Sequence, residues 1–254
     1  MVDDKRCRRQ EAGLLTATLR TQDRSARGQR VGTNSLPVEA SNCVSREDSV
    51  NEYDEPKLVR RLSQVSLKGQ AAFAAACAER TFPLYERYAA LTGQGNQAQL
   101  RAALDAAWKA VGTEVSREDL ARWRKVAGAL VPDDEDPGWI DETAYGQNGA
   151  AAIAYTLSTH LTGNPQDAGW AARQLYEAAD YAAQRQLGDL DINDPRAEDA
   201  LRATLVVQEA LFGIQEVLAF VNDKSEVTCQ DAVRLKRQAY DAGERLAKFT
   251  LRSS

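Results

Sequence analysis

Several residue types on which enzymes and cofactor sites depend are scarce in this chain. Its 254 residues include a single histidine, His160, and four cysteines that stand far apart without any CxxC pair. These spacings exclude the common zinc sites and small disulfide frameworks. The sequence also contains no phosphate-binding loop, dinucleotide fingerprint, HExxH or GxSxG motif. We therefore expect no metal, no cofactor and no catalytic residue, with His160 at the surface or capping a helix and Cys77 in the core.

Aromatic residues are absent from the first 52 positions, and Tyr53 is the first one. The opening stretch is rich in Ser, Thr, Gln, Asn, Arg and Gly, so it buries too little apolar surface to offset the entropy of ordering. We predict a disordered N-terminal extension over residues 1–52 and one helical domain over residues 53–252. The basic cluster at residues 5–9 predicts no nucleic-acid arm, because acids are interspersed in the extension and no aromatic can stack on bases.

The origin of this extension has two interpretations. Met1 is the only methionine, and arginine outnumbers lysine 24 to 8, a bias typical of GC-rich bacterial genomes in which GTG start codons are common. In one interpretation Val50 marks the native start and the extension lies upstream of it. In the other, residues 1–50 are a native segment of the protein.

Long apolar runs are also missing. No stretch approaches the roughly 18 apolar residues of a membrane span. The run at residues 13–19 is too short and too rich in threonine for a signal peptide. Together with the cysteine spacing, this pattern predicts a reduced cytoplasmic protein that does not contact a membrane.

The remaining sequence is helical in pattern from Glu55 onward. Apolar residues recur every three or four positions, and Ser, Thr, Asn or Asp precedes most of these segments as a candidate N-cap. The last long segment is predicted to run from Pro195 to about Asn222 before a final helix. Pro83 interrupts the run FAAACAERTFPLYERYAAL, so we expect that helix to kink or restart near residues 80–82. The pattern predicts an all-α fold, a single compact bundle of seven or eight helices.

Arg80 stands out because it falls on the apolar stripe of its predicted helix. An arginine that is buried there must be paired, and Asp105, Asp180 and Glu209 are candidate partners from other helices. Two interpretations stay open. One is a structural ion pair. The other is a ligand site near the proline kink, in which Glu79, Arg80 and Asp105 surround a small anion that Arg80 clamps.

A run of four carboxylates lies next to a tryptophan between two predicted helices. Asp133, Asp134, Glu135 and Asp136 precede Trp139, and prolines stiffen both sides. Such a segment is suited to contact a basic partner, because tryptophan is enriched at binding hot spots. In the alternative interpretation the charges only solvate a loop and Trp139 folds onto the bundle.

Several segments together resemble a known family. They are Leu58–Leu62, Gln70–Arg80 with the pattern FxAxxxER, and Phe82–Tyr85 with the pattern aromatic-Pro-x-Tyr. They are similar to the uncharacterised bacterial YjaG-like family, domain of unknown function 416, over about residues 58–214. The resemblance implies a compact helical bundle in the bacterial cytoplasm with no established activity. The family tends to carry an acid where this chain has Ala152, which argues against a shared carboxylate site.

These observations predict a non-catalytic interaction module for a protein partner, with a basic partner as one option, comparable to immunity proteins or antitoxins. Acidic surfaces steer onto basic partners, and the chain carries a net charge of −5. The alternative is a helical bundle that binds or converts a small anionic ligand near the proline kink. A homodimer is compatible with both hypotheses.

Overall fold

The computed structural model describes residues 51–133, 135, 138–188 and 195–250. The chain divides into two units, Met1–Glu47 and Asp48–Ser254, and every described residue belongs to the second unit. Residues 1–50 of the predicted N-terminal extension, and the predicted contact residues Asp134 and Asp136, lie outside the described residues, whereas residues 51 and 52 of that extension are described.

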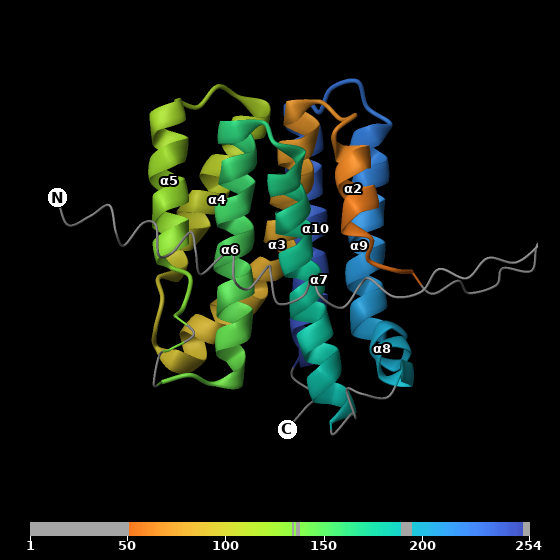
Figure 1. Ribbon diagram of the computed structural model, residues 1–254. Helices are drawn as coiled ribbons and strands as arrows, with labels where there is room; N and C mark the ends of the chain where they lie inside the picture. The colour runs from red at the N-terminus through yellow and green to blue at the C-terminus, as the bar shows by residue number, and fades with distance from the viewer. Residues whose placement is uncertain (1–50, 134, 136–137, 189–194, 251–254) are drawn as a thin grey trace, which may run out of the picture. The chain divides into compact units, whose positions relative to one another are not determined.

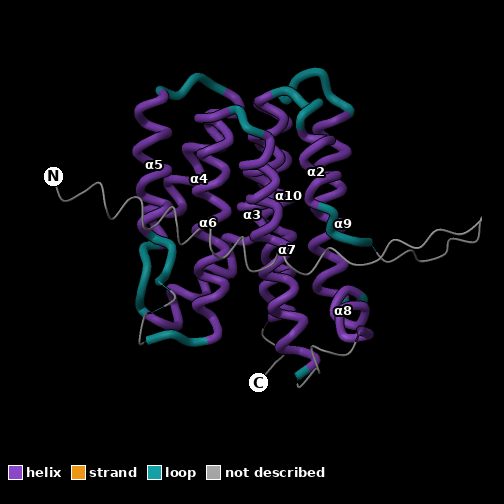
Figure 2. The backbone as a smooth tube through the Cα atoms, in the orientation of Figure 1, coloured by secondary structure: helices purple, strands orange, loops and turns teal. Residues whose placement is uncertain are grey.

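The described residues contain nine helices and no strand (Figures 1 and 2). The all-α prediction is confirmed, although the number of helices exceeds the predicted seven or eight. The elements are α2 (Glu55–Leu62), α3 (Leu67–Thr92), α4 (Gln97–Gly112), α5 (Arg117–Ala129), α6 (Asp141–Thr162), α7 (Pro165–Leu187), α8 (Pro195–Arg202), α9 (Leu205–Asn222) and α10 (Cys229–Phe249).

One source of the difference in number is the segment predicted as one helix from Pro195 to Asn222. The structure breaks it into α8 and α9 at Ala203 and Thr204. Thr204 has an extended backbone, with φ −65° and ψ 145°, and its hydroxyl donates to the Leu201 carbonyl at 2.7 Å. A threonine that turns its side chain back onto the preceding turn competes with continued helix, which explains the break.

Helix α3 is the centre of the domain. It packs against α4, α6, α7, α9 and α10, and Figure 1 shows it behind α6. Its alanine-rich run over residues 71–78 is completely buried. Small side chains on a central helix allow its neighbours to approach closely, so most sides of α3 contribute to the core.

Pro83 lies within α3, which continues from Leu67 to Thr92. Of the two predicted outcomes, the restart of the helix is therefore wrong, and the kink stays a prediction. The residues after the proline pack as expected, because Leu84, Tyr85 and Tyr88 are all buried. Proline removes one backbone hydrogen bond, and burial of these large side chains stabilises the helix against that loss.

The predicted helix starts are confirmed where the structure describes them. The side chains of five predicted N-caps accept a hydrogen bond from a backbone N–H in the first turn, namely Ser66, Asn96, Ser116, Asn164 and Thr228. Each cap of this kind stabilises its helix by about 1 kcal/mol. Gly163 ends α6 in the left-handed conformation, with φ 67°, which glycine adopts without strain.

The residues that precede α2 are tied to the bundle. The Asn51 N–H donates to the Gln208 side-chain oxygen at 3.0 Å, and the Gln208 amide donates back to the Asn51 carbonyl at 3.1 Å. The Tyr53 ring stacks on Tyr176 with 4.6 Å between ring centroids. The packed domain therefore includes residues as early as Asn51.

Among the described helices, α9 alone has the length and apolar composition that a membrane span needs. Half of that stretch is buried inside the domain. Core helices of globular proteins meet the same criterion, and α9 packs against α3 and α7.

Candidate functional site

Glu79 lies at the centre of a closed polar network between α3 and α4. Its carboxylate is 1% exposed and accepts hydrogen bonds from both terminal nitrogens of Arg101, at 2.6 and 2.9 Å. The Trp108 indole N–H donates to the same carboxylate at 2.7 Å. The buried carboxylate accepts two hydrogen bonds from one arginine and a third from tryptophan, so its charge is well compensated. Glu79 therefore holds α3 and α4 together.

Arg101 extends this network to the surface. Its Nε donates to Asp105 Oδ1 at 2.9 Å, and the Lys236 ammonium of α10 donates to the same oxygen at 2.7 Å. Burial lowers the pKa of Arg101, but the hydrogen bonds and charges of Glu79 and Asp105 outweigh burial and raise the pKa overall. Two of the three predicted ligand residues, Glu79 and Asp105, are thus joined through an arginine that the sequence analysis missed. The i, i+4 spacing of Arg101 and Asp105 was the available signal.

Arg80 points to the opposite side of α3, toward α9 and α10. One residue of helix rotates the side chain by about 100°, so Glu79 and Arg80 face different neighbours. The Arg80 Nη2 donates to Glu216 Oε2 at 3.2 Å, and burial lowers the pKa of the guanidinium. The predicted partners were wrong: Asp105 pairs with Arg101, and Asp180 accepts a hydrogen bond from Gln184 of its own helix.

The third predicted partner, Glu209, does lie close to Arg80 without bonding to it. Both residues line a small cavity of about 20 Å³ together with Leu175, Arg245 and Phe249. The Arg80 Nη1 is buried and has no hydrogen-bond partner. The predicted trio of Glu79, Arg80 and Asp105 therefore does not form one site, and Arg80 stands apart in a site with α9 and α10.

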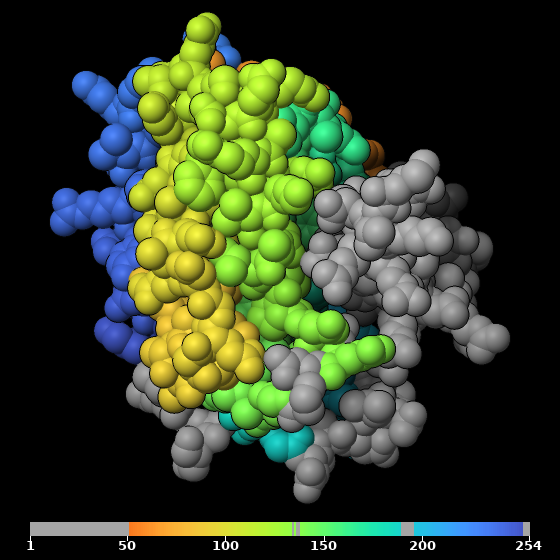
Figure 3. Space-filling view, turned by 90° about the vertical axis from the view of Figure 1, so that its left-hand side faces the viewer, coloured from red at the N-terminus to blue at the C-terminus, as the bar shows by residue number. Residues whose placement is uncertain are grey.

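The acidic segment connects α5 to α6. Its described carboxylates, Asp133 and Glu135, are exposed, and Trp139 and Ile140 leave 39% and 38% of their surface exposed. Because 39% exposure leaves most of the Trp139 surface covered, both predicted interpretations, partner contact and folding onto the bundle, stay predictions. Figure 3 shows the side of the domain that α4 and α5 form, with α10 along its edge.

The histidine and the core cysteine both lack the environment of a catalytic group. The His160 Nε2–H donates to the Ala107 carbonyl of α4 at 3.0 Å, and burial lowers its pKa to about 4. The surface or capping role expected for His160 is thus wrong, because its ring bridges two helices. Cys77 is buried as predicted, and burial raises the pKa of its thiol to about 12. A thiol in this state is a poor nucleophile at neutral pH.

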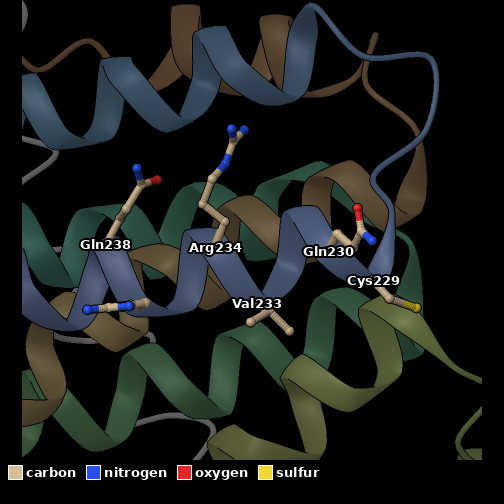
Figure 4. A pocket seen from close by; sticks show the side chains of 6 residues that line it. Cys229, Gln230, Val233, Arg234 and Gln238 are labelled. Carbon is tan, nitrogen blue, oxygen red and sulfur yellow. The ribbon is translucent and has the colours of Figure 1, made fainter.

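A shallow, open surface on α10 was not predicted from the sequence. Figure 4 shows the side chains that form it, all from this one helix: Cys229, Gln230, Val233, Arg234, Arg237 and Gln238. Val233 is 71% exposed, and Leu205 and Phe212 of α9 are each 60% exposed. An apolar residue among the polar residues of an amphipathic helix was the signal for this surface.

The described residues contain no group of His, Cys, Asp and Glu side chains that is arranged to hold a metal ion. The described residues form an all-helical domain around one buried central helix, α3. The buried charges of α3 bond to side chains of the neighbouring helices. The family model described as Protein of unknown function (DUF416) matches residues 57–245, and the chain belongs to this family. The resemblance to domain of unknown function 416 is thus confirmed.

A solved structure supports the same fold. The crystal structure of a DUF416 family protein from Shewanella baltica OS155 superposes with a TM-score of 0.62 at 17% sequence identity. The match covers 72% of this chain and 93% of that chain. No curated protein matches the sequence. At this identity the likeness concerns the fold, and function has to be argued from the surface and the polar groups.

Proposed function

We propose that the protein is a non-catalytic interaction module that binds a basic protein partner through the segment between α5 and α6. The observation that carries the proposal is the exposure of two successive large apolar side chains, Trp139 and Ile140, beside exposed carboxylates. A partly exposed tryptophan offers a large apolar area at little cost in side-chain entropy. The flanking negative charge selects for a basic partner and speeds its association.

Hydrogen bonds hold described residues at both ends of this segment. The Gln147 amide donates to the Pro132 carbonyl at 3.0 Å, and the Ile140 N–H donates to the Thr143 hydroxyl at 3.1 Å. The acidic first turn of α6 continues the negative surface, since Asp141 is 61% exposed. Because the Ile140 backbone is already held, this residue loses less conformational entropy when a partner binds, which raises affinity.

The state of the reactive side chains favours binding over catalysis. His160 is held by a backbone carbonyl, Cys77 is buried as a neutral thiol, and Glu79 is enclosed by Arg101 and Trp108. A general base or nucleophile has to reach a substrate in a cleft. None of these three groups offers that access, which favours binding. Within that class, the acidic segment suits a protein that covers the active site of a basic enzyme, as immunity proteins and antitoxins do.

Affinity capture with the full chain as bait tests this proposal. We expect a stoichiometric basic protein at low salt and its loss near 1 M salt, where the Debye length is about 3 Å. The double variant Trp139→Ala, Ile140→Ala should lose the partner, whereas Leu91→Ala should keep it, because Leu91 is 58% exposed outside this segment. The proposal is wrong if the double variant retains the partner or if no stoichiometric basic partner is found.

The open surface of α10 favours a second candidate, the docking of an acidic helix from a partner. Arg234 and Arg237 lie on this surface with Val233, and the Arg234 guanidinium lies 5.0 Å from the Phe220 ring centroid. The side-chain ridges of one helix pack between those of another, and carboxylates on that helix would meet the two arginines. Val233→Asp places a negative charge on this surface. It should abolish this contact in the same capture experiment and leave the contact at Trp139 intact.

A further inference from the structure

Arg80 is the starting point of a separate inference, which does not depend on the segment between α5 and α6. Its residue surface is 6% exposed, and only the Nη2 side of the guanidinium reaches a carboxylate, Glu216, at 3.2 Å. The Nη1 atom is buried without a partner, and Arg80 is one of the residues that line the small cavity. Leaving a charged donor unsatisfied inside a protein costs more than leaving a neutral one, so a species that accepts hydrogen bonds from Nη1 stabilises this arrangement.

Two glycines on different helices shape the space around Arg80. A Cβ at Gly213 of α9 would lie 2.8 Å from Arg80 Nε, and a Cβ at Gly243 of α10 would lie 2.6 Å from the Arg80 carbonyl oxygen. Any other residue at either position would push the arginine or its helix aside. The close fit of α9 and α10 around this side chain shows that the fold is built to hold an arginine at this position.

The charges around the cavity offset the guanidinium only in part. The Glu216 side chain is 58% exposed, so water screens much of its negative charge. Glu209, which is also exposed, brings a second negative charge to the lining, and Arg245 brings a second positive one. Arg245 is exposed and donates to the Asp241 carbonyl of its own helix at 3.2 Å.

The size of the cavity selects the ligand. A volume of about 20 Å³ accepts one particle of about the size of a water molecule. Phosphate or a metabolite would have to displace Phe249 or Leu175. We propose that a single small anion of halide size binds between Arg80 and Arg245. A neutral water could also accept from Nη1, but only an anion adds the charge that Arg80 lacks, and charge-assisted hydrogen bonds are the stronger ones.

Bromide diffraction tests this site directly. Crystals of the full chain grown with bromide in place of chloride should show an anomalous peak within about 3.5 Å of Arg80 Nη1, a normal distance for a charge-assisted contact of so large an ion. The proposal fails if the peaks lie at surface positions only and water fills the cavity.

Melting in solution provides an independent test. The melting temperature should rise with chloride to saturation, relative to equal concentrations of gluconate, which is too large for the cavity. Arg80→Met should abolish this difference, and Arg245→Gln should weaken the apparent chloride affinity by about tenfold, the scale of one charge-assisted hydrogen bond. Arg61→Met, at an exposed arginine of α2 that does not line the cavity, is the control that should retain it. Equal responses in wild type and Arg245→Gln, with an empty or water-filled cavity in the crystals, would overturn the proposal.

Discussion

Glu79 and Arg80 are neighbours in sequence and buried to a similar degree, yet the two sides of α3 treat them differently. On the α4 side, Glu79 is enclosed by three hydrogen bonds from Arg101 and Trp108. On the α9 and α10 side, Arg80 makes one hydrogen bond, to a half-exposed glutamate, and leaves Nη1 without a partner. From this difference we infer that a buried charge with all its hydrogen-bond partners joins helices, whereas a buried charge that lacks a partner is a candidate ligand site.

The largest effect should come from removing each charge in turn. Glu79→Ala leaves the buried Trp108 N–H without its acceptor and leaves Arg101 with Asp105 alone, and it should lower the free energy of unfolding by about 3–5 kcal/mol. Arg80→Met leaves only Glu216, which water can solvate, and fills the space with an apolar chain. We expect its stability within about 1 kcal/mol of wild type. Urea unfolding of both variants measures the difference, and equal losses would show that the two sides of α3 are equivalent.

A second prediction concerns the α4 side and its pH dependence. Burial lowers the pKa of His160 from 6.5 to about 4, so between these values the unfolded chain binds a proton that the folded chain excludes. The contribution of His160 is complete above pH 6.5 and is lost as pH falls toward 4, by roughly 2–3 kcal/mol. His160→Gln keeps a donor for the Ala107 carbonyl and should remove this part of the pH dependence. The measurement is urea unfolding from pH 7 to pH 4, and parallel curves for variant and wild type would contradict the assignment.

At the two glycines beside Arg80, substitution by alanine should lower the free energy of unfolding by different amounts. In Gly243→Ala the new Cβ meets the backbone of α3, which cannot move without shifting the helix, so we expect a loss of about 1–3 kcal/mol. In Gly213→Ala it meets the far end of the Arg80 side chain, which can rotate, and a loss below about 1 kcal/mol should follow. Thermal unfolding of both variants tests the order. A reversed order would mean that the guanidinium is held more firmly than the two helices.

The sequence predicted the all-α class, most helix starts and the place of Arg80 on the apolar face of its helix, because caps and periodicity are local properties. It did not predict the partners, since periodicity gives the face of a helix but not the neighbour that the face meets. Arg101 and Glu216 were therefore missed, although Glu216 lies two turns from the predicted Glu209 on the same helix. The role of His160 was missed for the same reason, because its acceptor is a backbone carbonyl on another helix.

The smallest effect is expected from removing residues 1–50, which tests whether the helical domain alone holds both sides of α3. A chain that begins at Asn51 keeps the two hydrogen bonds to Gln208 and the stacking of Tyr53 on Tyr176, so its free energy of unfolding should lie within about 1 kcal/mol of the full chain. A chain that begins at Glu55 loses those contacts and should be less stable by about 1–3 kcal/mol. Urea unfolding of the three chains gives both differences. If the chain from Asn51 were the one that lost stability, residues 1–50 would contribute to the fold, and the prediction of a disordered extension would be wrong.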